Sequence, residues 1–203
     1  MKYNLSEITD LIRNRRTIYP EQYSDRQIQR EQVEHILNNA IWAPTHGNTQ
    51  PWRFVVFMEE GRQQLADFLG QTYLDTVPKD KQNDQKLAKM ITRPIKASVA
   101  VAVVMKRDTT GRIKELEEIE AVSCAIQNMH QTCTAYGIGG FWATPGLIER
   151  PEMNTFLGIE EEDKCLGIFY MGYPQEAWPK GQRKPLEYLT EWRTAEAPVK
   201  TSE

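Results

Sequence analysis

Apolar residues recur along the chain either three and four positions apart or in short runs, two patterns that predict helices and strands respectively. The strongest helical pattern covers residues 114–136 and forms one apolar stripe about 30 Å long at 1.5 Å per residue. The stripe consists of Leu116, Ile119, Val122, Ile126, Met129, Cys133 and Tyr136. It is longer than one small sheet should cover, so it predicts either a central helix or a helix at a subunit interface.

Shorter patterns predict the remaining elements. Asn4 and Glu7 stand at capping-box spacing before a first helix, and a second helix is expected to start near residues 24–27 and to end at Pro44. Two further helices are predicted at residues 61–73 and 151–158. Strands are predicted at residues 53–58, 97–105, 141–144 and 165–174. The polar residues 78–93 predict an exposed helix or flap.

These elements mix without a strict strand–helix–strand rhythm, and neither an internal repeat nor a low-complexity tract occurs. The expected fold is therefore α+β. We expect a single domain over residues 1–192 and a frayed tail over residues 193–203.

Composition narrows the classes of function. The chain has 203 residues, a hydrophobic fraction of 40%, a charged fraction of 26% and a net charge of −3. This balance argues against a general nucleic-acid binder, which is usually basic. No apolar run approaches the roughly 20 residues of a membrane helix, and the start lacks a signal-peptide pattern, so a cytoplasmic protein is expected without membrane partners. Cys124, Cys133 and Cys165 are odd in number and lack a C-x-x-C pair, which predicts reduced thiols.

Standard catalytic signatures are missing from the sequence. It contains no glycine fingerprint of a dinucleotide fold, no phosphate-binding Walker loop and no G-x-S-x-G. His35, His46 and His130 are not at metal-ligand spacing, and no metal site is expected.

Two polar clusters remain as candidates in the first quarter of the chain. Arg15, Arg16 and Thr17 are either solvated charge at a helix C-terminus or an anion site, because forked guanidinium donors suit phosphate. The run APTHGNTQPWRF, residues 43–54, carries more hydrogen-bonding groups than a turn between a helix and a strand needs. It is either a polar turn or a ligand-binding loop.

Two further candidates lie in the second half. The glycines of GIGGFWAT, residues 137–144, are either a helix cap or a surface against which a flat ligand can lie. In KGQRKPLEYL, residues 180–189, the cations are either solvated or ligands of a phosphate. Together, the four clusters supply the parts of a flavin mononucleotide (FMN) site.

In this order and at these separations, RRT, APTHGNTQPWRF, GIGGFW, LGIFYMGYP and RKPLEYL resemble the nitroreductase family, from about residue 11 to 190. The short form is similar to the small single-domain branch. The resemblance implies a central, mostly antiparallel sheet flanked by helices, with a long dimer-interface helix. It also implies bound FMN, NADH or NADPH as co-substrate, and a homodimer with shared active sites.

The resemblance also assigns FMN contacts. Arg15, Arg16 and Thr17 match the motif that meets the ribityl phosphate and the pyrimidine edge of the ring, and Arg183, with Lys184 beside it, matches a late cation near the phosphate. The residues that would line the flavin, some of them across the dimer interface, are His46, Asn48, Gln50, Gly139, Gly140, Trp142, Ala143 and Thr144.

The activity that the resemblance implies is transfer of hydride from NAD(P)H through FMN to a nitroaromatic, a quinone or a similar small acceptor, one substrate after the other. No side chain need be catalytic, although His46 is a candidate proton donor. The alternative is a flavin-binding relative without a reductase role, either flavin-fragmenting, dehalogenating or regulatory. Two positions depart from the family pattern: Tyr19 replaces a common Lys, and Ala143 replaces an Arg of some small members.

Overall fold

The computed structural model describes residues 2–194 and has at its centre a four-stranded sheet with the order β1-β2-β4-β3. All three neighbouring pairs of strands are antiparallel. The strands are β1 (Trp52–Phe57), β2 (Val99–Met105), β3 (Gly139–Ala143) and β4 (Lys164–Gly172). The predicted α+β class with an antiparallel sheet is confirmed.

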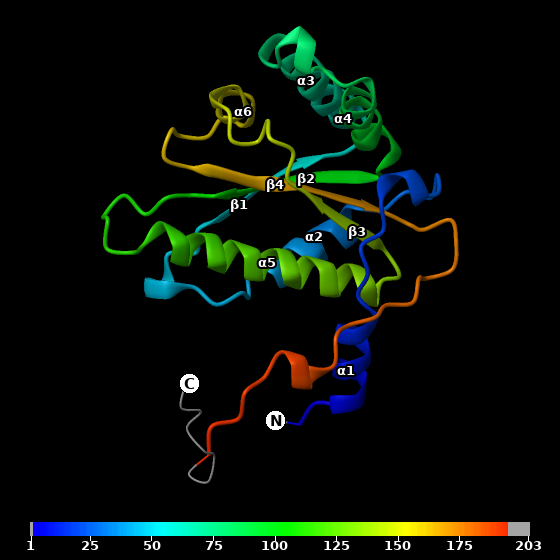
Figure 1. Ribbon diagram of the computed structural model, residues 1–203, viewed down its shortest axis with the longest axis vertical. Coiled ribbons are helices and arrows are strands. Elements are labelled where there is room, and N and C mark those ends of the chain that lie inside the picture. Colours follow the sequence, from blue (N-terminus) through cyan, green and yellow to red (C-terminus); the bar gives the residue numbers. More distant parts are fainter. Residues whose placement is uncertain (1, 195–203) are drawn as a thin grey trace, which may run out of the picture.

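Helices cover both faces of this sheet (Figure 1). α2 and α5 pack on one face, and α3, α4 and α6 lie on the other. The helices are α1 (Leu5–Asn14), α2 (Arg30–Ala40), α3 (Glu60–Thr76), α4 (Asp84–Lys96), α5 (Glu115–Ala135) and α6 (Pro151–Leu157). Short 3₁₀ turns lie at Pro20–Gln22, His46–Asn48, Lys79–Lys81 and Leu186–Tyr188.

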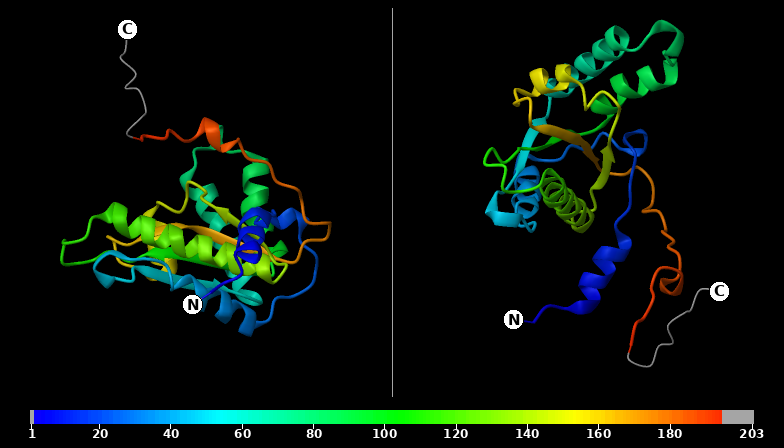
Figure 2. Two further views of the ribbon diagram at one scale, coloured as in Figure 1. Left: turned by 90° about the horizontal axis from the view of Figure 1, so that it is seen from below. Right: turned by 60° about the vertical axis from the view of Figure 1, so that its left-hand side comes forward.

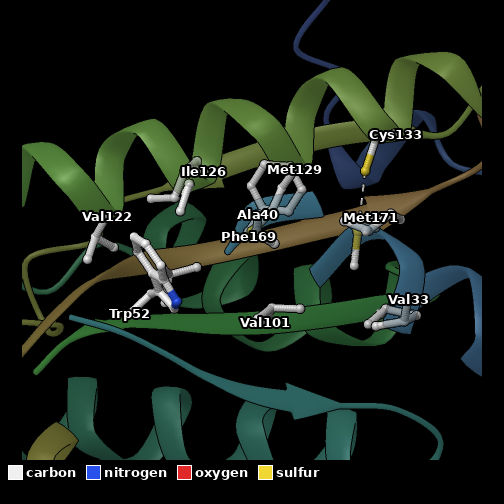
Figure 3. Packing of buried hydrophobic residues seen from close by; sticks show 14 of the residues in the cluster. Val33, Ala40, Trp52, Val101, Val122, Ile126, Met129, Cys133, Phe169 and Met171 are labelled. Carbon is white, nitrogen blue, oxygen red and sulfur yellow. Dashed lines mark hydrogen bonds between the residues drawn. The ribbon is translucent and has the colours of Figure 1, made fainter. Parts of the chain in front are cut away.

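The apolar stripe of α5 lies against the sheet (Figure 3). Val122, Ile126, Met129 and Cys133 are fully or almost fully buried there, whereas Leu116 at the start of the stripe is 61% exposed. Within the single chain α5 is a central helix, and the sheet and α2 together cover most of its stripe. A subunit interface along this helix stays a prediction.

The predicted start of the second helix was wrong. Residues 24–27 precede α2 in an extended segment that is tied to the core, because the backbone N–H and the hydroxyl of Ser24 both donate to the carbonyl of Tyr173. The helix begins at Arg30 and ends at Ala40, before Pro44. In the sequence, a Ser that bonds to the residue after a strand cannot be told from a Ser that caps a helix.

The polar segment 78–93 is mostly the helix α4, which begins at its cap Asn83. The helix packs its partly buried Leu87 and Met90 against the sheet face that also carries α3. The first of the two sequence alternatives, an exposed helix, is therefore closer to the structure than a flap.

The segment before the sheet places the first candidate cluster. After α1, Thr17 pairs with Gly140 in an isolated parallel bridge, and the N–H of Ile18 donates to the carbonyl of Gly140. The RRT motif therefore lies beside the beginning of β3. No residue of α1 itself is buried, and α1 projects away from the sheet (Figure 2, right).

No helix within residues 2–194 has both the length and the apolar character that crossing a membrane requires. The single domain over residues 1–192 stays a prediction. Of the predicted tail, residues 195–203 lie outside the described part of the chain.

Candidate functional site

Three arginines from the two ends of the chain gather beside β3. The pKa of Arg15 is lowered, first by burial and then by the charges of Arg183 and Arg16. Within residues 2–194, none of the three forms an ion pair with a carboxylate. Arg15 and Arg16 are partly buried, and Arg183 is exposed. Guanidinium ions gathered without a counter-charge favour an anion, and phosphate fits their forked donors.

Arg16 holds this cluster together. Its Nε donates to the carbonyl of Pro179 at 3.0 Å, and its Nη1 donates to the carbonyls of Arg13 and Arg15 at 2.6 and 2.7 Å. Gly181 lies against the guanidinium so closely that a β-carbon there would overlap it. Arg16 thus uses three donor contacts on backbone carbonyls and ties the segment of Arg183 to the end of α1.

The two glycines at the start of β3 serve the packing of the chain. A β-carbon on Gly139 would lie 2.7 Å from the Cβ of Ile18, and one on Gly140 would lie 2.7 Å from Cζ of Phe169 and 3.0 Å from Nδ1 of His130. The structure thus gives both glycines a reason within the packing of the chain itself. A flavin contact here stays a prediction.

The end of β3 borders a cavity of about 440 Å³. Trp142, Ala143 and Thr144, all predicted to line a flavin, contribute to its wall. The indole Nε1 of Trp142 donates to the carbonyl of Leu166 at 2.9 Å, which fixes the ring. The carbonyl of Gly140 points to the outer edge of β3, toward Ile18, so the backbone groups of Trp142, two residues on, point the same way. This edge can hydrogen-bond a planar ligand.

Arg93 of α4 is the principal residue that sequence reasoning missed. Its guanidinium lies 4.9 Å from the ring centroid of Phe141 and forms an ion pair with Glu21 at 2.9 Å. Tyr19, where the family often has Lys, packs its ring 4.7 Å from that of Phe141. Residue 19 itself carries no cation, but Arg93 of α4 places one 5.9 Å from the ring centroid of Tyr19. The one signal in the sequence was the helical spacing of cations in residues 78–93.

The loop of His46, Asn48 and Gln50 has a constrained backbone. Gly47, Asn48 and Gln50 have φ angles of +57°, +53° and +47°. Nε2 of Gln50 donates to Oδ1 of Asn48 at 3.1 Å, and Nδ1 of His46 lies 2.8 Å from Oε2 of Glu117. A left-handed conformation costs a residue other than glycine on the order of 1 kcal/mol or more, and such strain is common at functional sites.

The structure does not bring this loop to the arginine cluster. Glu117, the partner of His46, is in the first turn of α5, whereas His130, which packs against Gly140, is near its last turn. Thirteen residues separate them, or about 20 Å along the helix axis. In Figure 1 the loop lies at the left end of α5, and α1 and β3 lie at its right end. Within one chain, the predicted site residues therefore form two separate groups.

The other titratable candidates are structural. His130 meets the ring of Phe169 edge-on, and burial, with a contribution from the charge of Arg15, lowers its pKa to about 4. Its neutral form adds no charge to the arginine cluster at neutral pH. Cys124, Cys133 and Cys165 are free thiols, as predicted, and no group of three potential metal ligands occurs in the part of the chain that the structure describes.

The sequence of this chain is similar to those of proteins named as nitroreductases. A sequence model described as "Nitroreductase family" matches residues 12–173. YdjA of Escherichia coli (strain K12), which carries the provisional name NAD(P)H nitroreductase, is 32% identical over 145 residues, which are 71% of this chain and 77% of YdjA.

Two solved structures share the fold. A nitroreductase-like family protein from Bacillus cereus superposes with a TM-score of 0.80 at 23% identity, over 95% of this chain and 98% of that one. A protein from Desulfovibrio desulfuricans, solved in complex with FMN, gives a TM-score of 0.71 at 24% identity, over 98% and 99% of the two chains.

Proposed function

The chain belongs to the nitroreductase family, and from this premise we propose that it is an FMN-dependent oxidoreductase that uses NADH or NADPH as co-substrate. The acceptors we propose are nitroaromatics, quinones and similar small molecules. FMN, when bound, would supply the chemistry: it accepts hydride from the nicotinamide and, after the nicotinamide has left, reduces the acceptor that takes its place. The protein binds and orients these partners.

The observation that carries the proposal is the arginine cluster without a counter-charge beside β3. Arg15 and Arg183 would bind the phosphate of FMN, with Lys184 as a further exposed cation nearby in the sequence. Arg16 and Thr17 would position them, because both are tied to the backbone of neighbouring segments. These residues fit the donor chemistry that a phosphate monoester needs.

β3 supports the rest of the cofactor in this proposal. From Gly140 to Thr144 the strand advances four residues, or about 13 Å, which suits a ribityl chain followed by a planar ring. Trp142, Ala143 and Thr144 would line the ring, with backbone groups of Trp142 available to its polar edge. Gly139 and Gly140 would lie below the ribityl chain.

The distant loop requires a second copy of the chain to take part. His46, Asn48 and Gln50 lie about 20 Å along α5 from the arginine cluster of their own chain. In a homodimer, the same loop of the second copy would complete the flavin site, with His46 as a ligand of the ring edge and a candidate proton donor. This arrangement uses the strained backbone of the loop, which folding alone does not explain.

The phosphate assignment is tested by Arg15→Ala. A charge-assisted hydrogen bond contributes about 1.5–3 kcal/mol, so we expect the variant to bind FMN about 10- to 100-fold more weakly in a fluorescence titration of the flavin-free protein. Arg30→Ala is the matched control, because Arg30 pairs with Glu34 on the exposed surface of α2. Unchanged FMN affinity in Arg15→Ala would refute this assignment.

A further inference from the structure

α4 presents one cationic face to the cavity at the end of β3. Lys86, Lys89 and Arg93 are three and four residues apart, which places them on the same side of the helix. All three belong to the cavity wall. No Asp or Glu lines the cavity within the described part of the chain.

The two lysines are not neutralised. Arg93 is paired with Glu21, and the charge of Lys89 reaches the same carboxylate only at longer range. Across residues 2–194, neither lysine side chain forms an ion pair or a hydrogen bond. One acidic group therefore faces three cations, and the cavity keeps a net positive charge.

The rest of the wall is apolar and aromatic. Phe141 and Tyr170 lie nearly parallel, with ring centroids 6.2 Å apart, and Leu69 and Met90 close the side toward α3 and α4. Such a wall accepts a flat apolar body, whereas the lysines require a negative group on it. The cavity has a volume of about 440 Å³, which is small for a whole dinucleotide. The flavin ring proposed to lie on Trp142, Ala143 and Thr144 would take its β3 side and leave the side of α4 to a second, smaller molecule.

We propose that this cavity binds the electron acceptor as an organic anion, a flat aromatic or quinone-like molecule whose carboxylate faces Lys86 and Lys89. That the ligand is the electron acceptor rests on the proposed function, whereas its negative charge is inferred from the cavity alone. The uncompensated lysines would both hold the anion and steer it toward the end of β3.

Isothermal titration calorimetry of the protein as purified, with 4-nitrobenzoate and with its methyl ester, tests the charge preference. We expect the carboxylate to bind about fivefold more tightly than the ester, since two exposed cations contribute on the order of 1 kcal/mol. Lys86→Gln with Lys89→Gln should abolish that ratio, and 0.5 M salt should reduce it in the unsubstituted protein.

Lys79→Gln with Lys81→Gln is the control, because these lysines precede α4 and do not line the cavity. It should keep the ratio of the unsubstituted protein. Equal binding of the two probes to the unsubstituted protein would overturn the inference, as would a double variant of Lys86 and Lys89 that kept the preference. A loss of NADPH affinity alone in that variant would also overturn it, since the cations would then serve the co-substrate.

The calorimetric result separates this inference from the proposed function. If the protein prefers the carboxylate but NADPH does not reduce its flavin, the cavity assignment holds and the reductase proposal fails. If NADPH reduces the flavin and neutral nitro compounds reoxidise it, but the carboxylate binds no better than its ester, the reductase proposal holds and the cavity assignment fails.

Discussion

Around Gly140, four segments of the chain meet: β3 itself, β4, the last turns of α5 and the segment that carries Arg15. The carbonyl of Gly140 accepts from Ile18, and the space where a side chain would stand is filled by Phe169 and His130. The packing of β3 against Phe169 of β4 and His130 of α5 therefore depends on the absence of one methyl group.

Gly140→Ala should lower the free energy of unfolding by about 1–3 kcal/mol, because Phe169 is fully buried and cannot move away from the added carbon. Urea denaturation measures this change. Gly146→Ala is the control, since a β-carbon there meets no atom within 4 Å. Equal stability of the two variants would show that the contact at Gly140 relaxes at no cost.

His130 should make the stability depend on pH. Burial lowers its pKa to about 4, below the ordinary value of 6.5, so the unfolded chain binds the proton more readily. The neutral, buried ring therefore costs no stability above about pH 6.5, and the free energy of unfolding decreases as the pH falls toward 4. At pH 5 the loss is about 2 kcal/mol.

Urea denaturation at pH 7 and pH 5 checks the size of this loss, with His130→Gln as the comparison because the variant lacks the titrating ring. The difference between the two proteins cancels the carboxylates that titrate in both. If the unsubstituted protein and His130→Gln lost equal stability between these pH values, His130 would not be the group responsible.

Single residues also show where sequence reasoning succeeds. Arg15 and Arg183 stand 168 positions apart in the sequence. The resemblance to the family pattern assigned both to one phosphate, and in the structure they are close enough for the charge of Arg183 to lower the pKa of Arg15. Arg93 was missed because a cation on an exposed helix usually faces solvent, and only the fold brings it over Phe141.

Among the elements, α1 is the one whose stability the single chain does not explain. It has ten residues, none of them buried, and isolated helices of this length are marginal in water. Leu5, Ile8 and Ile12 are 74%, 40% and 58% exposed and lie on one side of it. The segment after residue 185 exposes further large apolar side chains, namely Leu186, Tyr188, Leu189 and Trp192. In the proposed homodimer, a second copy of the chain would cover these surfaces.

Ile8→Glu with Ile12→Glu should convert the proposed homodimer to a monomer and lower its flavin content, because charges would replace the apolar face of α1 while the sheet and its helices stay unchanged. Sedimentation velocity and the visible spectrum measure the two effects. Glu7→Gln with Asp10→Asn, on the opposite side of α1, should leave the dimer intact. A monomeric unsubstituted protein that retains FMN would contradict the shared site.

Elements with one dominant pattern were the easiest to predict. The bounds of α5 differ by one residue at each end from the predicted 114–136, because its stripe repeats over six turns, and β2 is a continuous apolar run with every residue buried. The start of α2 and that of β3 were missed, because bonds to distant segments decide both. Gly137, with a φ of +70°, does end α5 as predicted.

At the scale of the whole molecule, the two groups of predicted site residues lie at the opposite ends of α5. The sequence named both groups but could not show that one chain keeps them about 20 Å apart. The proposed homodimer, in which each copy would lend its loop to the other, would resolve this separation. The central claim, a flavin held by the arginine cluster and reduced by NAD(P)H, concerns that complete assembly.

The visible spectrum of the purified full-length protein under anaerobic conditions, before and after addition of NADPH, tests this claim most directly. We expect the band of oxidised FMN, its bleaching by NADPH or NADH, and its return when a nitroaromatic or a quinone is added. A colourless protein that takes up no added FMN would contradict the flavin site, and bound FMN that neither nucleotide bleaches would contradict the reductase.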